Sequence, residues 1–202
     1  MGLPVSFSDV QQISPDAGLR VSREAATPTY SASTGLFTPA ATPTDVLALL
    51  LSGTPFPQAS VKRIIISGVS TSGGQVFVRC NLSGNGGDNG HANVTAFVHD
   101  KYDRAPSCAV WRFTANRSTG SAPVGGADTR AIINEGDLTL GVAGTSTGTP
   151  VVFDFSTGDK APTIKQQYDW ITVGFNGQTL PAGTQLRVTI MWTEQQAVRF
   201  GA

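Results

Sequence analysis

The clearest pattern in the chain is an alternation of apolar and polar residues near its C-terminal end. Over residues 185–193 every second residue is apolar, namely Leu186, Val188, Ile190 and Trp192. Arg187, Thr189, Met191 and Thr193 stand between and after them. Because side chains of a strand point alternately to its two faces, this stretch predicts a strand with one buried face.

Several other short runs show the same β-type pattern. In residues 75–82 (QVFVRCNL), Val76, Val78 and Cys80 fall on one side, whereas Phe77, Arg79 and Asn81 fall on the other. The remaining predicted strands are residues 61–69, 93–99, 109–114, 137–142, 150–155 and 168–175. These runs are rich in β-branched and aromatic residues and are bounded by turn residues, as strands are.

Turn residues between the runs predict how they connect. Ser72-Gly73-Gly74 separates residues 61–69 from residues 75–82, which predicts a hairpin of these two strands. Residues 93–99 and 109–114 are predicted to form a second pair, followed by a loop over residues 115–130. Asn176-Gly177 is a strong turn signal.

One apolar run is ambiguous. Asp45–Leu51 (DVLALLL) is nearly continuous in apolar residues, so its periodicity fits a short helix and a fully buried strand equally well. Apart from this run, the sequence predicts about eight short strands and no helix longer than two turns. These elements indicate an all-β fold. We expect a single β-sandwich or jelly-roll body over residues 41–202.

The first 40 residues differ from the rest. Prolines recur at positions 4, 15, 28 and 39, and the apolar residues are isolated: Val5, Phe7, Val10, Ile13 and Leu19. Without a sustained period, such a segment cannot bury enough apolar surface alone to offset its ordering entropy. We expect residues 1–40 to be an extended N-terminal arm that lies on its own body or on a neighbouring subunit.

Composition narrows the class of protein further. Thr and Ser together make 40 of 202 residues, and only 14% of the chain is charged, against roughly a quarter in an ordinary soluble domain. The formal net charge is zero, so no net field draws in nucleic acid or an anionic membrane. No apolar run reaches the ~18 residues of a membrane-spanning helix, and the N-terminus lacks the basic start and apolar core of a signal peptide.

Two cysteines, Cys80 and Cys108, do not make a disulfide framework in a chain of this length. Each stands in an apolar stretch, so we interpret both as small core residues of a protein that folds in a reducing cytoplasm. A single bridge between them stays open at this point, because the sequence does not give the distance between their Cα atoms.

The sequence holds few groups for catalysis or metal binding. His91 and His99 are the only imidazoles and lack the spacing of a zinc or iron site, so we interpret them as a loop and a strand residue. No serine-nucleophile elbow, phosphate-binding loop or dinucleotide fingerprint occurs. Residues 83–90 (SGNGGDNG) offer oxygens for calcium but lack the bidentate acid of an EF-hand, so we interpret them as a strand connection.

A glycosidase would need two carboxyl groups about 5–9 Å apart. The candidates are Asp100, Asp103, Asp154, Asp159, Asp169 and Glu194, of which Asp154 and Asp169 stand beside the aromatic residues Phe153 and Trp170. Trp111, Trp170 and Trp192 are candidates for stacking on sugar rings. Scattered acids are expected in any β-protein, and core packing is the stronger interpretation for at least two of the three tryptophans. We therefore expect no catalytic, cofactor-binding or metal-binding residue.

Seven short segments follow one another in a distinctive order: 30–37 (YSASTGLF), 41–45 (ATPTD), 61–68 (VKRIIISG), 112–120 (RFTANRSTG), 173–177 (VGFNG), 180–184 (LPAGT) and 190–194 (IMWTE). This series resembles a family of small β-rich structural proteins encoded among the virion genes of tailed bacteriophages and prophages. The segments cover about residues 30–195 and are turn and strand signatures rather than chemical motifs. The resemblance implies a particle component and does not fix its place in the particle.

The expected function is that of a non-enzymatic virion protein. The leading hypothesis is a capsid decoration (cement) protein on the head, which binds the major capsid protein or other virion subunits and forms a homo-oligomer, a dimer or trimer. The alternative is a tail, baseplate or fibre component with a carbohydrate-binding or receptor-binding role. In both cases we expect no cofactor, no nucleic-acid or membrane partner, and location in the virion after assembly in the host cytoplasm.

Overall fold

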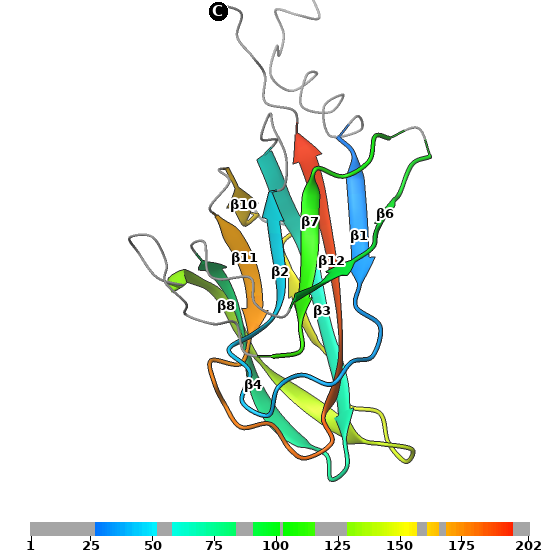
Figure 1. Cartoon of the computed structure of the whole chain (residues 1–202), viewed down its shortest axis with the longest axis vertical. Helices are drawn as coiled ribbons and strands as arrows, with labels where there is room; N and C mark the ends of the chain where they lie inside the picture. The colour runs from blue at the N-terminus through cyan, green and yellow to red at the C-terminus, as the bar shows by residue number, and fades with distance from the viewer. Residues whose placement is uncertain are drawn as a thin grey trace, which may run out of the picture.

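The computed structural model describes residues 27–51, 58–83, 91–101, 103–115, 129–156, 161–165 and 169–195, and only these are discussed as structure (Figure 1). Within these ranges the fold is all-β, as the sequence predicts, with twelve strands and no helix. The strands are β1 (Thr29–Ser33), β2 (Asp45–Leu51), β3 (Gln58–Ser70), β4 (Gly74–Ser83), β5 (His91–Val94), β6 (Ala96–Val98), β7 (Cys108–Phe113), β8 (Thr129–Val142), β9 (Val151–Asp154), β10 (Thr163–Ile164), β11 (Trp170–Gly174) and β12 (Gln185–Gln195). No helix in these ranges is long and apolar enough to cross a membrane.

The strands form two layers that pack face to face. Sheet A contains β6, β1, β12 and β3 in that order, with β9 and β10 on the far side of β3. Sheet B contains β5, β7, β2, β11, β4 and β8 in that order. The long strand β8 joins the two layers, because it pairs antiparallel with β4 over most of its length and parallel with β3 at Gly141 and Val142.

The opposite side of the molecule is closed by the segment that holds β5 and β6. β5 pairs with β7 in sheet B, and two residues later β6 pairs with β1 in sheet A. The chain therefore passes from one layer to the other within a single extended stretch, which runs from beside β7 toward β1 in Figure 1. As a result the sandwich is nearly barrel-shaped.

The hydrophobic core lies between the layers. The four alternating residues predicted for β12, Leu186, Val188, Ile190 and Trp192, are fully buried in it. The ambiguous run 45–51 is a strand, β2, and all seven of its residues are buried. Because β2 lies between β7 and β11 and is covered on both faces, it has no polar face to give it a period of two, which explains the ambiguity.

The predicted hairpin of residues 61–69 and 75–82 is wrong. The alternation predicted for the second strand is confirmed, but β3 and β4 do not pair, because the end of β8 lies between them in the strand order. Gly73 and Gly74, with φ of 70° and 136°, turn the chain from sheet A into sheet B. Such φ values are open to glycine and strained for other residues, so the turn signal was correct and the inferred pairing was not.

Other differences from the prediction also concern pairing and boundaries. Residues 93–99 pair with β7 only through β5, because β6 turns away to β1. β8 begins at Thr129 and is much longer than the predicted residues 137–142. Asn176 and Gly177, with φ of 53° and 75°, form the predicted turn, closed by the Gln178 N–H donating to the Phe175 carbonyl at 3.0 Å.

Part of the segment predicted as an arm over residues 1–40 belongs to the body. β1 is a strand of sheet A, paired with both β12 and β6, and the Tyr30 and Ala32 side chains are buried in the core. Phe37 is also buried, and its N–H and C=O exchange hydrogen bonds with Leu186. The body therefore includes residues that the sequence assigned to the arm. Residues 1–26, which hold Val5, Phe7, Val10, Ile13 and Leu19, lie outside the described ranges.

Candidate functional site

The acidic residues considered for catalysis are dispersed. Asp154 lies exposed on β9 in sheet A, with Arg63 3.8 Å away, whereas Asp169 is buried just before β11 in sheet B. Hydrogen bonds from the side chain and backbone of Ser156, with help from Arg63, hold the pKa of Asp154 below its usual value. Asp100 and Asp103 form a turn closed by the Asp103 N–H, and Asp159 lies outside the described ranges. The structure therefore does not bring Asp154 and Asp169 together as a pair.

Glu194 is the most deeply buried of the candidate acids that the structure describes, and its contacts are structural. Its side chain is fully buried at the end of β12. Oε1 accepts hydrogen bonds from the Cys108 N–H at 2.9 Å and the Trp192 Nε1–H at 3.0 Å, and Oε2 accepts from the Ser107 N–H at 2.9 Å. Arg104 Nη2 lies 3.9 Å from Oε2. Glu194 thus ties the start of β7 in sheet B to β12 in sheet A.

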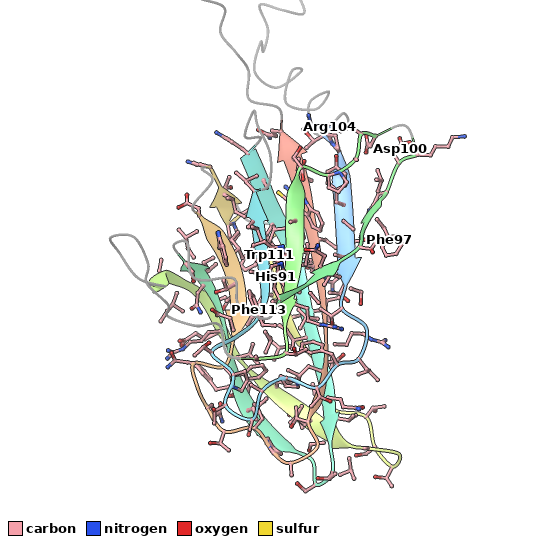
Figure 2. All side chains as sticks on the ribbon, in the orientation of Figure 1. His91, Phe97, Asp100, Arg104, Trp111 and Phe113 are labelled. Atoms are coloured by element: carbon pink, nitrogen blue, oxygen red, sulfur yellow. The ribbon has the colours of Figure 1, made fainter. Side chains whose placement is uncertain are left out.

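Tyr30 makes a further contact between sheet A and the segment that precedes β7. Its ring stacks on Trp192 with 5.6 Å between centroids, and its hydroxyl donates to the Arg104 carbonyl at 3.0 Å. Burial and the neighbouring Glu194 raise the pKa of Tyr30. The segment from Arg104 to Cys108 is therefore held by groups of sheet A. Figure 2 shows Arg104 at the upper end of the molecule.

The cysteines are free, and both are buried in the core as predicted. Burial raises the pKa of Cys80 to about 12. Burial and the adjacent carboxyl group of Glu194 raise the pKa of Cys108 still further.

In the part of the chain that the structure covers, no group of three or more His, Cys, Asp or Glu side chains could hold a metal ion. Of the calcium candidate at residues 83–90, only Ser83 is described.

His91 and two of the tryptophans lie on or near the outer face of sheet B. His91 is the first residue of β5 and stacks on Trp111 with 3.9 Å between ring centroids, and Trp111 meets Trp170 edge-on at 5.2 Å. Figure 2 shows His91, Trp111 and Phe113 close together along β7. His99 follows β6 instead, so the predicted loop and strand assignments of the two histidines are reversed. Trp192 and Trp170 are buried, which confirms packing as the role of two of the three tryptophans.

The outer face of sheet A has a different character. Hydroxyl-bearing side chains recur across it, among the apolar Ile65 and Met191 and the charged Arg63 and Arg187, and we call it the hydroxyl face: Thr29, Ser31, Ser33, Ser60, Ser67, Thr189 and Thr193. The Thr189 hydroxyl donates to Ser33 Oγ at 3.2 Å, and Ser60 Oγ lies 3.0 Å from Thr163 Oγ1 on β10. A cross-strand row of Phe97, Ser31, Met191, Arg63 and Asp154 crosses this face.

The hydroxyl face ends at β6, which has an unusually exposed aromatic residue. The Phe97 side chain is 61% exposed, the largest value among the exposed large apolar residues of the described chain. It projects outward from the edge of the molecule in Figure 2. Single exposed apolar residues are common on proteins, but here the residue lies on a terminal strand of a sheet, where backbone groups are also available. No sequence pattern identified Phe97, because the run 93–99 was expected to pair along its length with 109–114.

Comparison with protein-family models, with curated proteins and with solved structures finds no match to this chain. The site is therefore interpreted from its own residues. Two surfaces stand out: the hydroxyl face of sheet A with its exposed edge at β6, and the smaller aromatic cluster of His91, Trp111 and Trp170 on sheet B.

Proposed function

We propose that this chain is a non-enzymatic structural protein of a tailed-bacteriophage particle, a capsid decoration (cement) protein that binds the major capsid protein through the hydroxyl face of sheet A. The observation that carries the proposal is the composition of that face. Its hydroxyl groups donate and accept hydrogen bonds, and the charged groups of Arg63, Arg187 and Asp154 lie among them. Such a surface suits a broad contact made of many weak hydrogen bonds, repeated on every subunit of a shell.

The tie between the two sheets supports the same role. A protein that stabilises a shell transmits load between its bound face and the rest of its body. Glu194 joins β12, which carries Thr189 and Thr193 of the hydroxyl face, to the start of β7 in the opposite layer through the N–H groups of Ser107 and Cys108. The buried carboxyl group is fully engaged in these contacts, so it serves to hold the layers in a fixed relation rather than to carry out a reaction.

A second candidate function is favoured by the aromatic cluster on sheet B. A tail, baseplate or fibre component that binds carbohydrate would use aromatic rings for stacking, and Trp111 is only partly buried. However, His91 already covers one face of Trp111 and Trp170 meets its edge, so a sugar ring would have to displace His91. This requirement makes the carbohydrate-binding role the weaker proposal.

Thr189→Arg tests the leading proposal. Thr189 lies in the middle of the hydroxyl face, paired with Ser33 on one side and Ile65 on the other. A bulky charge there is expected to reduce co-sedimentation with particles that lack the native protein at least tenfold, with the thermal melting temperature unchanged within a few degrees. Thr139→Arg, at an exposed position of β8 in sheet B, is the matched control and should bind as the unaltered chain does. Equal binding of both variants would contradict a contact through the hydroxyl face.

A further inference from the structure

The outer edge of β6 has backbone groups without a ladder partner among the described strands. β6 pairs only with β1 among the described strands, with Tyr30 opposite Val98 and Ala32 opposite Ala96. One residue beyond, the His99 N–H donates to the Thr29 carbonyl at 3.0 Å. Hydrogen-bonded pairs alternate along an antiparallel ladder, so Phe97 and His99 direct their N–H and C=O groups toward β1. Ala96 and Val98 therefore direct theirs away from it.

This edge is short, because β6 has three residues, but it lacks the other features that protect terminal strands. Natural edges are also blocked by charged side chains, proline or bulges, and β6 (AFV) has none of these. Phe97 adds an exposed aromatic ring beside the free backbone groups. A free edge with an apolar side chain is an arrangement that receives an additional strand from another segment.

The chain supplies a segment suited to this edge. In residues 3–10 (LPVSFSDV), Val5 and Phe7 alternate with Ser6 and Ser8, and the only charged residue is Asp9. A strand with this pattern would place Val5 and Phe7 on one face, where they could contact Phe97. Residues 11–26 connect it to the body and can span up to about 55 Å when extended, more than the roughly 40 Å diameter of a body of this size.

Topology favours a second copy over the same chain as the donor. The chain enters β1 at the end of the sheet where residues 99–107 leave β6 for β7, as the hydrogen bond between His99 and Thr29 shows. A strand of the same chain on the free edge, connected at that end, would have to cross over the end of β6 to reach β1. Its connection would then cross residues 99–107, and connections at one end of a sheet avoid such crossings. A strand from another molecule meets no such restriction.

We propose that residues 3–10 of one copy add as a strand to the free edge of β6 in a second copy, so that copies associate by exchange of their N-terminal arms. This inference concerns association in solution and does not rest on the proposed role in a particle. The contact is heterologous, with an arm that donates and an edge that accepts. Each function can therefore be removed separately.

Two variants of the full chain separate donor from acceptor. Ala96→Pro removes an N–H that points away from β1, so it should block strand addition and leave the β1–β6 pairing intact. Phe7→Asp removes the apolar anchor of the arm and leaves the edge intact. Val152→Asp is the matched control, because Val152 is another exposed apolar residue of sheet A, on β9.

The test is the molar mass in solution, measured by light scattering after gel filtration over a hundredfold range of concentration. The unaltered chain and Val152→Asp should reach at least twice the monomer mass, and each of the other two variants should stay monomeric. An equal mixture of Ala96→Pro and Phe7→Asp should restore a 1:1 pair, since one supplies the arm and the other the edge.

Other outcomes overturn the proposal. A monomeric unaltered chain at all concentrations would mean that the arm does not bridge copies. Association that survives Phe7→Asp and is lost only in Ala96→Pro would indicate direct pairing of two β6 edges. Association that survives both variants would place the contact elsewhere. Far-ultraviolet circular dichroism of each variant confirms that the β-body is folded before the masses are compared.

Discussion

Buried polar groups at single positions explain how the two layers are held in register. Glu194 is fully buried, yet both of its oxygens accept hydrogen bonds, and the donors come from residues 86 and 87 positions away in the sequence as well as from Trp192. A buried acceptor with this many donors stabilises one specific arrangement, because any other arrangement would leave the donors unpaired in an apolar interior. The charge of Arg104 near Oε2 adds to this preference.

Glu194→Gln is expected to destabilise the fold. The amide nitrogen of glutamine donates where a carboxyl oxygen accepts. In the place of Oε2 it would face the Ser107 N–H as a second donor and leave that N–H only its longer contact of 3.1 Å to Oε1, at a cost of about 1–3 kcal/mol. Chemical denaturation measures the change in free energy of unfolding. Glu135→Gln is the control, because its ion pair with Arg79 is partly exposed and should contribute less than about 1 kcal/mol. Similar effects of the two substitutions would contradict the role assigned to Glu194.

The cysteine thiols are expected to be unreactive in the folded protein. Only the thiolate attacks disulfide reagents, and burial raises the pKa of Cys80 to about 12 and that of Cys108 further. We predict that neither thiol reacts with a chromogenic disulfide at pH 8 on the timescale of minutes and that two thiols react after denaturation. Rapid reaction of one thiol in the native state would show that its surroundings are open to solvent.

The same shifts predict a loss of stability at high pH. Because the folded-state pKa of each thiol lies above the unfolded value near 9, the folded state holds its protons where the unfolded state has lost them. Stability is therefore fully present below pH 9 and falls as the pH rises toward 12, by up to about 1.4 kcal/mol per pH unit for each thiol. Urea unfolding at pH 8 and pH 10.5 measures the loss. The double variant Cys80→Ala, Cys108→Ala should show a smaller decrease, and an equal decrease would assign it to other groups.

At the scale of single elements, a close approach of backbones fixes how β11 ends beside β2. The Thr44 carbonyl accepts hydrogen bonds from the N–H groups of Phe175 and Asn176, at 3.0 and 3.3 Å. A Cβ atom placed on Gly174 would overlap that same carbonyl. The turn at Asn176 and Gly177 follows directly, so glycine at position 174 lets the strand end against β2 before the chain reverses.

Gly174→Ala should therefore destabilise the protein by about 1–3 kcal/mol, the usual cost of forcing an extra group into a closely packed site. Thermal or urea unfolding measures it. Gly144→Ala serves as the comparison, because its Cβ would meet nothing within 4 Å and only its φ of 80° opposes the substitution, at about 1 kcal/mol. A cost at position 174 no larger than at position 144 would contradict the close-contact argument.

The elements also show how far a sequence can be interpreted alone. β12 was predicted nearly to its limits because one face of it is buried and the other is not. β2 stayed ambiguous because neighbours cover both of its faces. The pairing of β3 with β4 was predicted wrongly, since a glycine turn indicates a reversal of the chain and does not indicate whether the next strand returns to the same sheet.

At the scale of the whole molecule, the candidate site depends on contacts between distant segments. The hydroxyl face combines residues of β1, β12 and β3, which are far apart in the sequence, so no local motif marks it. The exposure of Phe97 follows from the departure of β6 from β7 toward β1, a choice that local patterns do not encode. The abundance of Thr and Ser was visible in the composition, but the composition does not show which of them share the outer face of sheet A.

The hydroxyl face and the free edge of β6, both in sheet A, are consistent with the proposed role. The hydroxyl face offers a broad contact for a shell, and the free edge of β6 offers a contact between copies at the end of the same sheet. A decoration protein needs both kinds of contact, because weak contacts gain strength when linked copies bind a repeating lattice. A tail or fibre component would need only a few copies at one place in the particle.

The number of copies per particle is thus the measurement that tests the central claim most directly. Purified particles are separated by denaturing gel electrophoresis, and the band of this protein is quantified against the major shell protein. A decoration protein predicts hundreds of copies per particle, in a fixed ratio to the shell subunit. A count of a few to a few dozen copies, or absence from the particle, would contradict the account.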